Sequence, residues 1–267
     1  MTDVRWLASY EDDGAVLFRI GRVDDELIAE WMGVARLTAS RDGRRSRLEF
    51  VPGCDAREAR KIEQGSARLL LRHAAGDLAF HGSAIELSGQ VAVLLGRSGQ
   101  GKSTLAAWLS MHGATLFADD AVAIDPAGEH RWSVSAVEPD HWLDGDARRA
   151  LGVAAPDAEE TSAKRPTRSA RPGTGSAPLA AFVELVFADI AAPRLVRLRG
   201  LEALAALVPQ AVRFVLDEPA LYRSELDRLS ELVEFVDVFR LERPPVLAHL
   251  DVTGRLVQNL FRKDEAR

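Results

Sequence analysis

A glycine-rich motif constrains this chain more than any other feature of its sequence. Residues 96–103 read GRSGQGKS, which fits the phosphate-binding pattern of a glycine, four residues of any type, and then Gly-Lys-Ser. The apolar run VAVLL at 91–95 precedes the motif, and Leu105 and Leu109 follow it at helical spacing. Between a strand and a helix this pattern binds phosphate, while elsewhere the same residues can form an ordinary glycine turn. The sequence therefore predicts a strand, loop and helix that bind a nucleotide.

Each part of the motif has a physical reason. Gly96, Gly99 and Gly101 allow positive-φ turns that point backbone N–H groups inward, with no Cβ in the way of a phosphate. The helix that begins near Lys102 adds the positive end of its dipole, and the lysine can reach the β and γ phosphates. The hydroxyl of Ser103 can ligate Mg²⁺. The expected nucleotide-binding residues are Gly96, Arg97, Ser98, Gly99, Gln100, Gly101, Lys102, Ser103 and Thr104.

Two carboxylates follow the loop helix after a short connection. Asp119 and Asp120 end the stretch ATLFADD and precede the apolar run that begins at Ala121. One carboxylate can hold Mg²⁺ directly or through water, and the other can accept the proton of an attacking hydroxyl. The alternative is a polar pair that begins the turn between two strands.

A histidine opens a predicted hairpin just before the motif. SAIEL at 83–87 and VAVLL at 91–95 are separated by SGQ, which favours antiparallel pairing, and His81 precedes them. Strand direction leaves His81 either near the end of the sheet opposite the loop or folded over toward it. Because an imidazole titrates near neutral pH, both proton transfer and a purely structural role stay open.

A stretch of different composition lies at 156–178. It is rich in Pro, Gly, Ser and Thr and has no apolar periodicity, so we expect a long mobile loop. Its cations could clamp a nucleotide or a phosphorylated product when the loop closes, or they could simply be solvated. These cations are Lys164, Arg165, Arg168 and Arg171.

Composition and charge restrict the partners. The formal net charge of −6 gives no overall positive field to attract nucleic acid or an anionic membrane surface. The chain has no apolar run of about 18 residues that would suggest a membrane span, and its acidic first residues suggest no signal peptide. Cys54 is the single cysteine, which excludes an internal disulfide and fits a reducing compartment. We expect a cytoplasmic protein that binds neither nucleic acid nor membranes.

Strands and helices interleave along the chain, which is typical of an α/β fold. We expect a small N-terminal α/β segment over 1–80 and a second domain over 81–267. The N-terminal segment is predicted to hold strands at 33–40 and 44–51 and a helix over 55–73. Further strands are expected at 114–120, 121–125, 181–188, 194–200 and 236–242. Further helices are expected at 201–211, 218–235 and 246–261.

The segments HGSAIEL, VAVLLGRSGQGKST and GATLFADDAVAID resemble, in order and spacing, the catalytic domain of HPr kinase/phosphorylase and HPr-kinase-like proteins. The resemblance covers about residues 81–125, and its most specific feature is the short distance from the loop to the Asp-Asp pair. It implies a P-loop kinase core of the HPr kinase and phosphoenolpyruvate carboxykinase type, with ATP and Mg²⁺ as cofactors. The implied reaction is phosphoryl transfer to a serine hydroxyl of a protein.

The resemblance also implies roles for residues of this chain. Lys102 and Ser103 would take the phosphates and the metal, Asp119 would be the catalytic carboxylate, and Asp120 the metal-side carboxylate. His81 matches the histidine that opens the hairpin of this family, which implies a catalytic role. Because HPr kinases assemble into oligomers, the resemblance leaves open that this chain forms a homo-oligomer.

This chain also departs from the family pattern. The glutamate-containing signature of the bifunctional HPr enzymes is not found in its usual form, and Glu138 is a positional candidate for its glutamate. The N-terminal segment is short, as in the divergent branch, some of whose members serve peptide natural-product pathways. The substrate and any reverse phosphorylase reaction stay open.

Three functions stay open at this point. The first is a kinase that phosphorylates a serine of a protein or peptide. The second is a kinase of a small-molecule hydroxyl, which presents the same nucleophile. The third is a binding module gated by ATP without transfer. Decarboxylation of the phosphoenolpyruvate carboxykinase kind rests on fold relationship alone, so it ranks last.

Overall fold

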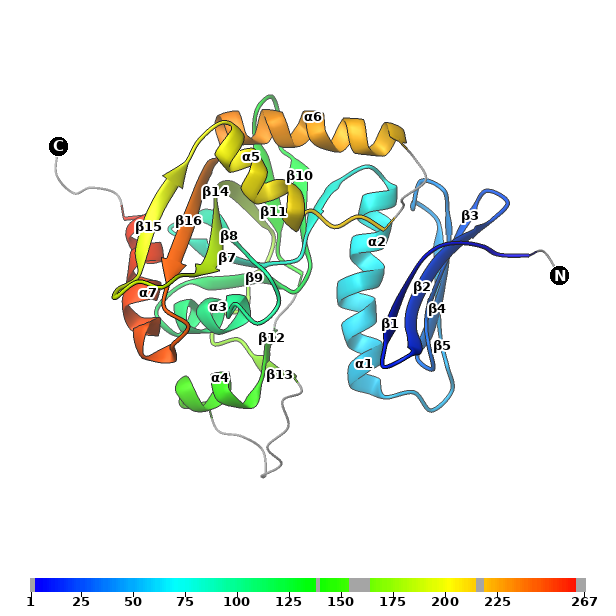
Figure 1. Ribbon diagram of the computed structural model, residues 1–267, viewed down its shortest axis with the longest axis horizontal. Helices are drawn as coiled ribbons and strands as arrows, with labels where there is room; N and C mark the ends of the chain where they lie inside the picture. Colours follow the sequence, from blue (N-terminus) through cyan, green and yellow to red (C-terminus); the bar gives the residue numbers. More distant parts are fainter. Residues whose placement is uncertain (1–2, 138–139, 154–163, 215–218, 263–267) are drawn as a thin grey trace. The chain divides into compact units, whose positions relative to one another are not determined.

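The computed structural model describes residues 3–137, 140–153, 164–214 and 219–262. It is a mixed α/β protein that divides into two compact units (Figure 1). The first unit is Met1–Phe80 with Ala211–Arg228, and the second is His81–Gln210 with Leu229–Arg267. The sequence predicts an uninterrupted second domain over 81–267, and the grouping of Ala211–Arg228 with the first unit departs from it.

The first unit contains an antiparallel sheet in which each strand pairs with the next along the chain. The strands are β1 (Arg5–Asp12), β2 (Ala15–Val23), β3 (Glu26–Trp31), β4 (Ala35–Ser40) and β5 (Ser46–Phe50). The two strands predicted at 33–40 and 44–51 are confirmed as β4 and β5. The first three strands were not predicted, because β1 is mostly exposed and shows no alternation of apolar and polar residues.

One helical segment covers this sheet, and it is not regular throughout. It consists of α1 (Ala56–Lys61), a π-helical turn (Ile62–Ser66) and α2 (Ala67–Ala74). Asp55 caps its start, since its side chain accepts from the backbone N–H of Arg57 at 2.8 Å and of Glu58 at 3.1 Å. The predicted helix over 55–73 is therefore present, with an irregular turn that contains Gly65, a residue unfavourable in a helix interior. Leu70 packs in the same apolar core as sheet residues such as Leu37.

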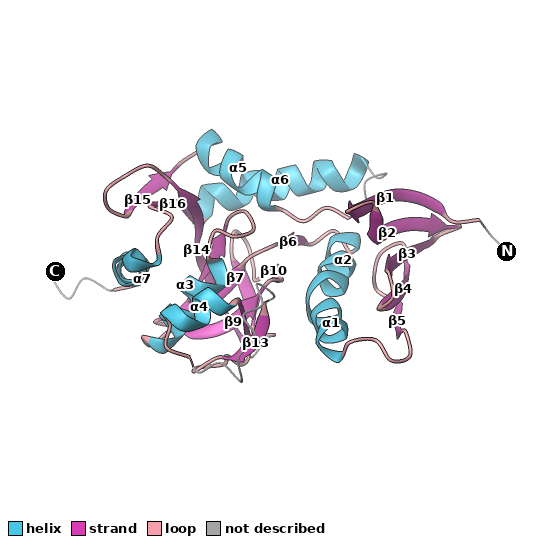
Figure 2. Cartoon of the chain, turned by 60° about the horizontal axis from the view of Figure 1, so that its bottom comes forward, coloured by secondary structure: helices cyan, strands magenta, loops and turns pink. Residues whose placement is uncertain are grey.

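The second unit contains a larger mixed sheet (Figure 2). Its strands are β7 (Ser83–Leu87), β8 (Gln90–Leu95), β9 (Thr115–Asp119), β10 (Val122–Pro126), β11 (Trp132–Ser135), β14 (Ser176–Phe187), β15 (Arg194–Leu198) and β16 (Asp237–Arg243). The order is β10-β11-β14-β8-β7-β9, with β16 paired to β14 and β15 paired to β16. The predicted hairpin is confirmed, because β7 and β8 pair antiparallel with Ser83 opposite Leu94.

Three parallel strands, β8, β14 and β16, matter most for the site. Leu95 pairs with Glu184, and Phe187 pairs with Arg243, so the carboxyl ends of these strands lie at one edge of the sheet. In α/β sheets, ligands bind in the crevice beyond this edge. The strands come from distant parts of the chain, so this edge is assembled only by long-range pairing.

Helices complete the second unit. They are α3 (Lys102–Met111), α4 (Gly145–Ala150), α5 (Leu201–Leu207) and α7 (Leu250–Asn259), with short 3-10 turns at Val208–Gln210 and Leu247–His249. A further helix, α6 (Pro219–Phe235), contributes residues to both units. Helix α3 packs against β7, β9 and α7 around a core that includes Leu105, Leu109 and Val257. The helices expected after residue 200 and the strands expected at 181–188, 194–200 and 236–242 are confirmed within a few residues.

The expected long loop over 156–178 is wrong for part of its length. Arg165–Arg168 form β13, which pairs antiparallel with β12 (Asp140–Leu143), and β14 begins at Ser176. Between them, the backbone of Gly173 donates to Leu116 O at 2.7 Å. The composition was misleading because Pro166 is the only apolar residue of β13, and pairing with β12 rather than its own sequence holds β13 in place. Residues 154–163 and Glu138 lie outside the described residues.

In the part of the chain that the structure describes, there is no helix with the length and apolar character needed to span a membrane.

Candidate functional site

The glycine loop, residues 96–101, connects β8 directly to α3, as predicted. Gly96, Gly99 and Gly101 have backbone φ values of 140°, 81° and 69°, which residues other than glycine rarely adopt. A Cβ on Gly96 would lie 2.8 Å from Leu185 O of β14. The loop therefore turns tightly against the neighbouring parallel strand, and it opens at the amino end of α3.

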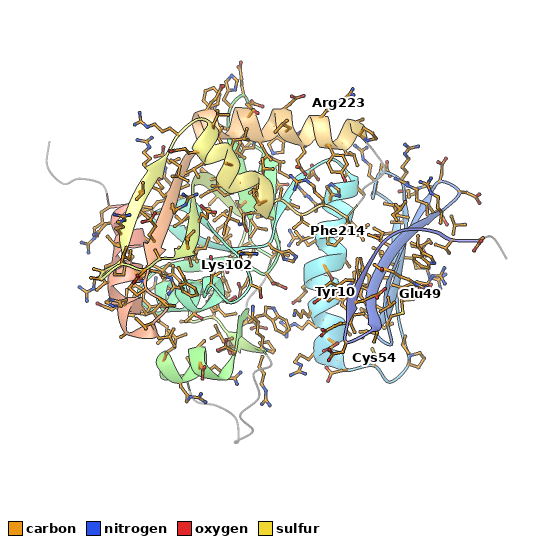
Figure 3. The ribbon with its side chains drawn as sticks, viewed as in Figure 1. Tyr10, Glu49, Cys54, Lys102, Phe214 and Arg223 are labelled. Atoms are coloured by element: carbon orange, nitrogen blue, oxygen red, sulfur yellow. The ribbon has the colours of Figure 1, made fainter. Side chains whose placement is uncertain are left out.

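Lys102, labelled in Figure 3, is the first residue of α3 and bonds to the backbone of the loop. Its Nζ donates to Gly96 O at 2.8 Å and to Arg97 O at 3.2 Å. Burial and the nearby charge of Lys164 lower the pKa of Lys102, while the two carboxylates that follow α3 oppose this shift. A cation so placed favours an anion at the mouth of the loop.

Asp119 is the last residue of β9, is 1% exposed, and is surrounded by hydrogen-bond donors. Its Oδ1 accepts from Ser83 Oγ at 2.5 Å and from Ser103 Oγ at 3.0 Å, and its Oδ2 accepts from Trp142 N at 2.8 Å. Burial raises the pKa of Asp119, and these hydrogen bonds act in the opposite direction. The structure thus brings Ser103, a predicted metal ligand, into contact with the first carboxylate of the pair.

Asp120 and His81 lie together beside this carboxylate. Asp120 is partly exposed and has a φ of 75°, and its carbonyl oxygen is 3.0 Å from His81 Nδ1. Because a carbonyl can only accept, this contact assigns a proton to Nδ1, and in the neutral imidazole Nε2 is then an acceptor. His81 is exposed and precedes β7, whose start is opposite the end of β8. Of the two positions left open by the sequence, the structure shows the one on the side of the loop.

A pocket of about 320 Å³ lies over the glycine loop. One wall is formed by the loop and the start of α3, including Lys102 and Ser103, and the other includes Phe187 and Arg243. A larger hollow of about 900 Å³ lies against β4 and β5 in the first unit, and it contains none of the candidate residues. The smaller pocket therefore contains predicted loop residues such as Lys102 and Ser103, whereas Asp119, Asp120 and His81 are not among its lining residues.

The basic residues expected on the loop at 156–178 do not all reach this pocket. Lys164 lines it. Arg168 instead lies with its Nη1 3.6 Å from Asp140 Oδ1, and Arg171 Nη1 donates to Gly113 O at 3.4 Å. The described residues contain no group of three or more His, Cys, Asp or Glu side chains that could hold a metal ion.

Four residues of the site were not predicted from the sequence: Ser83, Trp142, Phe187 and Arg243. Ser83 could have been found, since it begins the predicted hairpin strand next to His81. Phe187 and Arg243 fall at or next to the ends of predicted strands, but only the parallel pairing of β14 with β8 and of β16 with β14 shows that those ends meet the loop. Trp142 acts through its backbone N–H, which leaves no signal in the sequence.

The fold and this site define a mixed α/β protein with a glycine loop, a lysine and a carboxylate pair at one edge of a sheet. No family model matches the chain. It is 43% identical over 75 residues to an HPr kinase/phosphorylase of Prosthecochloris aestuarii, and the match covers 28% of this chain and 21% of that protein. The chain is therefore similar to an HPr kinase/phosphorylase over about a quarter of its length, in line with the predicted resemblance, and the match spans about a fifth of that protein.

A solved structure, the Hpr(Ser) kinase/phosphatase from Coxiella burnetii, also matches. It is 13% identical, with a TM-score of 0.37, and the match covers 68% of this chain and 95% of that chain. At this TM-score the likeness supports no statement about the site or its activity.

Proposed function

We propose that this protein is a kinase that transfers the γ-phosphoryl group of ATP, with Mg²⁺, to the hydroxyl of a serine in a protein or peptide. The observation that carries the proposal is the 3.0 Å hydrogen bond from Ser103 Oγ to Asp119 Oδ1. This bond joins Ser103, which follows Lys102 in the glycine motif, to Asp119, the first carboxylate after helix α3. The name of the HPr kinase/phosphorylase relative supports the same class of reaction.

The phosphates of the nucleotide would bind at the glycine loop, which we take as a P-loop. The backbone N–H groups of the loop and the amino end of α3 supply donors and a positive dipole end. Lys102 already faces the loop carbonyls and would add its charge to the β and γ phosphates. Catalysis would then come mainly from positioning and charge neutralisation.

Ser103 and a carboxylate would hold Mg²⁺, which supplies charge neutralisation on the phosphates when it is bound. Mg²⁺ keeps several waters and needs only one or two protein oxygens beside the phosphates, so a site without a cluster of acidic residues suits it. The family resemblance implies the metal side for Asp120 and the catalytic role for Asp119. The hydrogen bond from Ser103 supports the opposite division, with Asp119 on the metal side.

Asp120 and His81 would then face the acceptor hydroxyl. Asp120 is partly exposed, whereas the 1% exposed Asp119 could reach an acceptor only by losing its donors. His81 keeps Nε2 as an acceptor next to Asp120. We propose that Asp120 accepts the proton of the attacking hydroxyl, with His81 positioned beside it.

Purified protein incubated with γ-labelled ATP and Mg²⁺ tests the proposal in three parallel reactions, with a cell-extract proteome, with a metabolite panel, and with no acceptor. We expect label on protein serine, and none with Lys102→Ala. Label on a metabolite would replace the protein acceptor by a small-molecule acceptor. Nucleotide binding without transfer in any reaction would reject a kinase in favour of a nucleotide-gated module.

A further inference from the structure

Arg243 is a buried cation that neither the motif nor the carboxylate pair accounts for. It is the last residue of β16, is 5% exposed, and lines the pocket over the glycine loop. Its Nη2 donates to Gln100 O at 2.7 Å, and its guanidinium lies 4.8 Å from the ring centroid of Phe187. Its Nε is buried and has no hydrogen-bond partner among the described residues.

No carboxylate of the described chain forms an ion pair with Arg243. The adjacent Glu242 is 2.6 Å from Arg194 and so is already paired. Asp144 and Asp146 line the same pocket, but Asp144 caps α4 and Asp146 pairs with an arginine of that helix. A buried charge is costly unless it is paired, and burial lowers the pKa of Arg243 accordingly. The missing partner is therefore an anion that the described part of the chain does not provide.

The glycine loop is shaped to receive this arginine. A Cβ on Gly101 would lie 2.7 Å from Arg243 Nη2, so the absence of a side chain at Gly101 lets the guanidinium approach the loop. The loop and Arg243 both lie at the carboxyl ends of parallel strands, where Lys102 and Lys164 also line the pocket. A guanidinium offers five donors in one plane, and only one is used here, so the others remain for phosphate oxygens.

We propose that Arg243 binds a phosphate of the nucleoside di- or triphosphate held by the glycine loop. The inference rests on the proposed function, because it takes the loop as the nucleotide site. Since Nη2 also holds Gln100 O, the same side chain couples the bound phosphate to the shape of the loop. Arg243 is thus both a ligand-binding residue and a tether of the loop.

The substitution Arg243→Met separates a ligand-binding role from a structural one. Methionine fills a similar volume without the charge, and removing an unpaired buried charge is often neutral or stabilising. We expect the unfolding temperature of the ligand-free protein to stay the same or rise. We expect the affinity for ADP, measured by calorimetry, to fall by a factor on the order of 10 to 100. The ADP affinity of Arg243→Lys should lie between those of the wild type and Arg243→Met, because lysine keeps the charge but lacks the planar set of donors.

Arg194→Gln is the matched control, because Arg194 is largely exposed on β15 and contacts the neighbouring Glu242. We expect its ADP affinity to stay within about twofold of the wild type. An Arg243→Met affinity within twofold of the wild type would overturn the proposal, as would an equal loss in Arg194→Gln. If the wild type and the control bind no ADP, the proposed nucleotide site itself is rejected.

Discussion

At the scale of single residues, the site depends on polar groups that are buried or tightly held. Asp119 and Arg243 are almost completely enclosed, while Asp120 and His81 remain accessible at the edge of the same region. Enclosed charges bind fixed partners, and accessible ones can meet a substrate. This difference in exposure is why we place the metal and the nucleotide on the enclosed side and the acceptor on the accessible side.

His141 shows what burial costs a titratable residue near this site. It is 2% exposed, neither ring nitrogen has a partner among the described residues, and burial lowers its pKa from 6.5 to about 4. The native state therefore resists protonation, while the unfolded chain takes up the proton below pH 6.5. Its contribution to stability is present above about pH 6.5 and is lost as the pH falls toward 4.

We expect the substitution His141→Leu to remove this pH dependence. The wild type should lose on the order of 3 kcal/mol of unfolding free energy from this residue between pH 6.5 and pH 4, and the variant should lack that part of the loss. Urea unfolding of both proteins across this range is the measurement. Parallel curves for the two proteins would show that His141 does not titrate as described.

At the scale of elements, the glycine loop is constrained by its neighbour β14. Gly96 has a φ of 140°, and a side chain added there would also clash with a backbone carbonyl of β14. Gly99 has a φ of 81°, but an added Cβ would have nothing within 4 Å. We expect Gly96→Ala to destabilise the protein by about 1 to 3 kcal/mol and to weaken ADP binding. Gly99→Ala should cost about 1 kcal/mol or less. Thermal unfolding and ADP titration test the pair, and equal effects would contradict the close contact with β14.

Helix α3, which begins at the glycine loop, packs against helix α7. An added Cβ on Gly254 would lie 2.1 Å from the ring of Trp108. Alanine normally stabilises a helix interior relative to glycine by about 1 kcal/mol. Here we expect Gly254→Ala to lower stability by about 1 to 3 kcal/mol instead, because the two helices must separate. Val252→Ala, at an exposed position of α7, should change stability little, and a stabilised Gly254→Ala would contradict this packing.

Local elements were predictable where the sequence carries a local signal. The hairpin of β7 and β8, the loop and α3 follow from short apolar runs, glycines and helical spacing. The strands β11, β12 and β13 are four residues long, and the only apolar residue of β13 is a proline, so they were not expected. Their structure depends on pairing with partners that the sequence pattern does not specify.

At the scale of the whole molecule, the sequence could not show which strands lie side by side. β14 separates β8 from β16, so the loop residues 96–101 and Arg243 meet although they are far apart in the chain. Apart from Lys164, the predicted residues that the structure brings to the site lie between His81 and Asp120, which is one continuous stretch. Of the site residues that were not predicted, Trp142, Phe187 and Arg243 come from later strands that complete the pocket, and only Ser83 lies within that stretch. The roles of all these residues and the division into domains stay predictions.

The central claim is that the loop and the carboxylate pair form a phosphoryl-transfer site. The most direct measurement compares the wild type with Asp120→Asn, using transfer from γ-labelled ATP to extract proteins and ADP affinity on the same samples. We predict that transfer falls by about a factor of 100 or more while the ADP dissociation constant stays within about twofold. Undiminished transfer by Asp120→Asn, or no transfer by the wild type, would contradict the account.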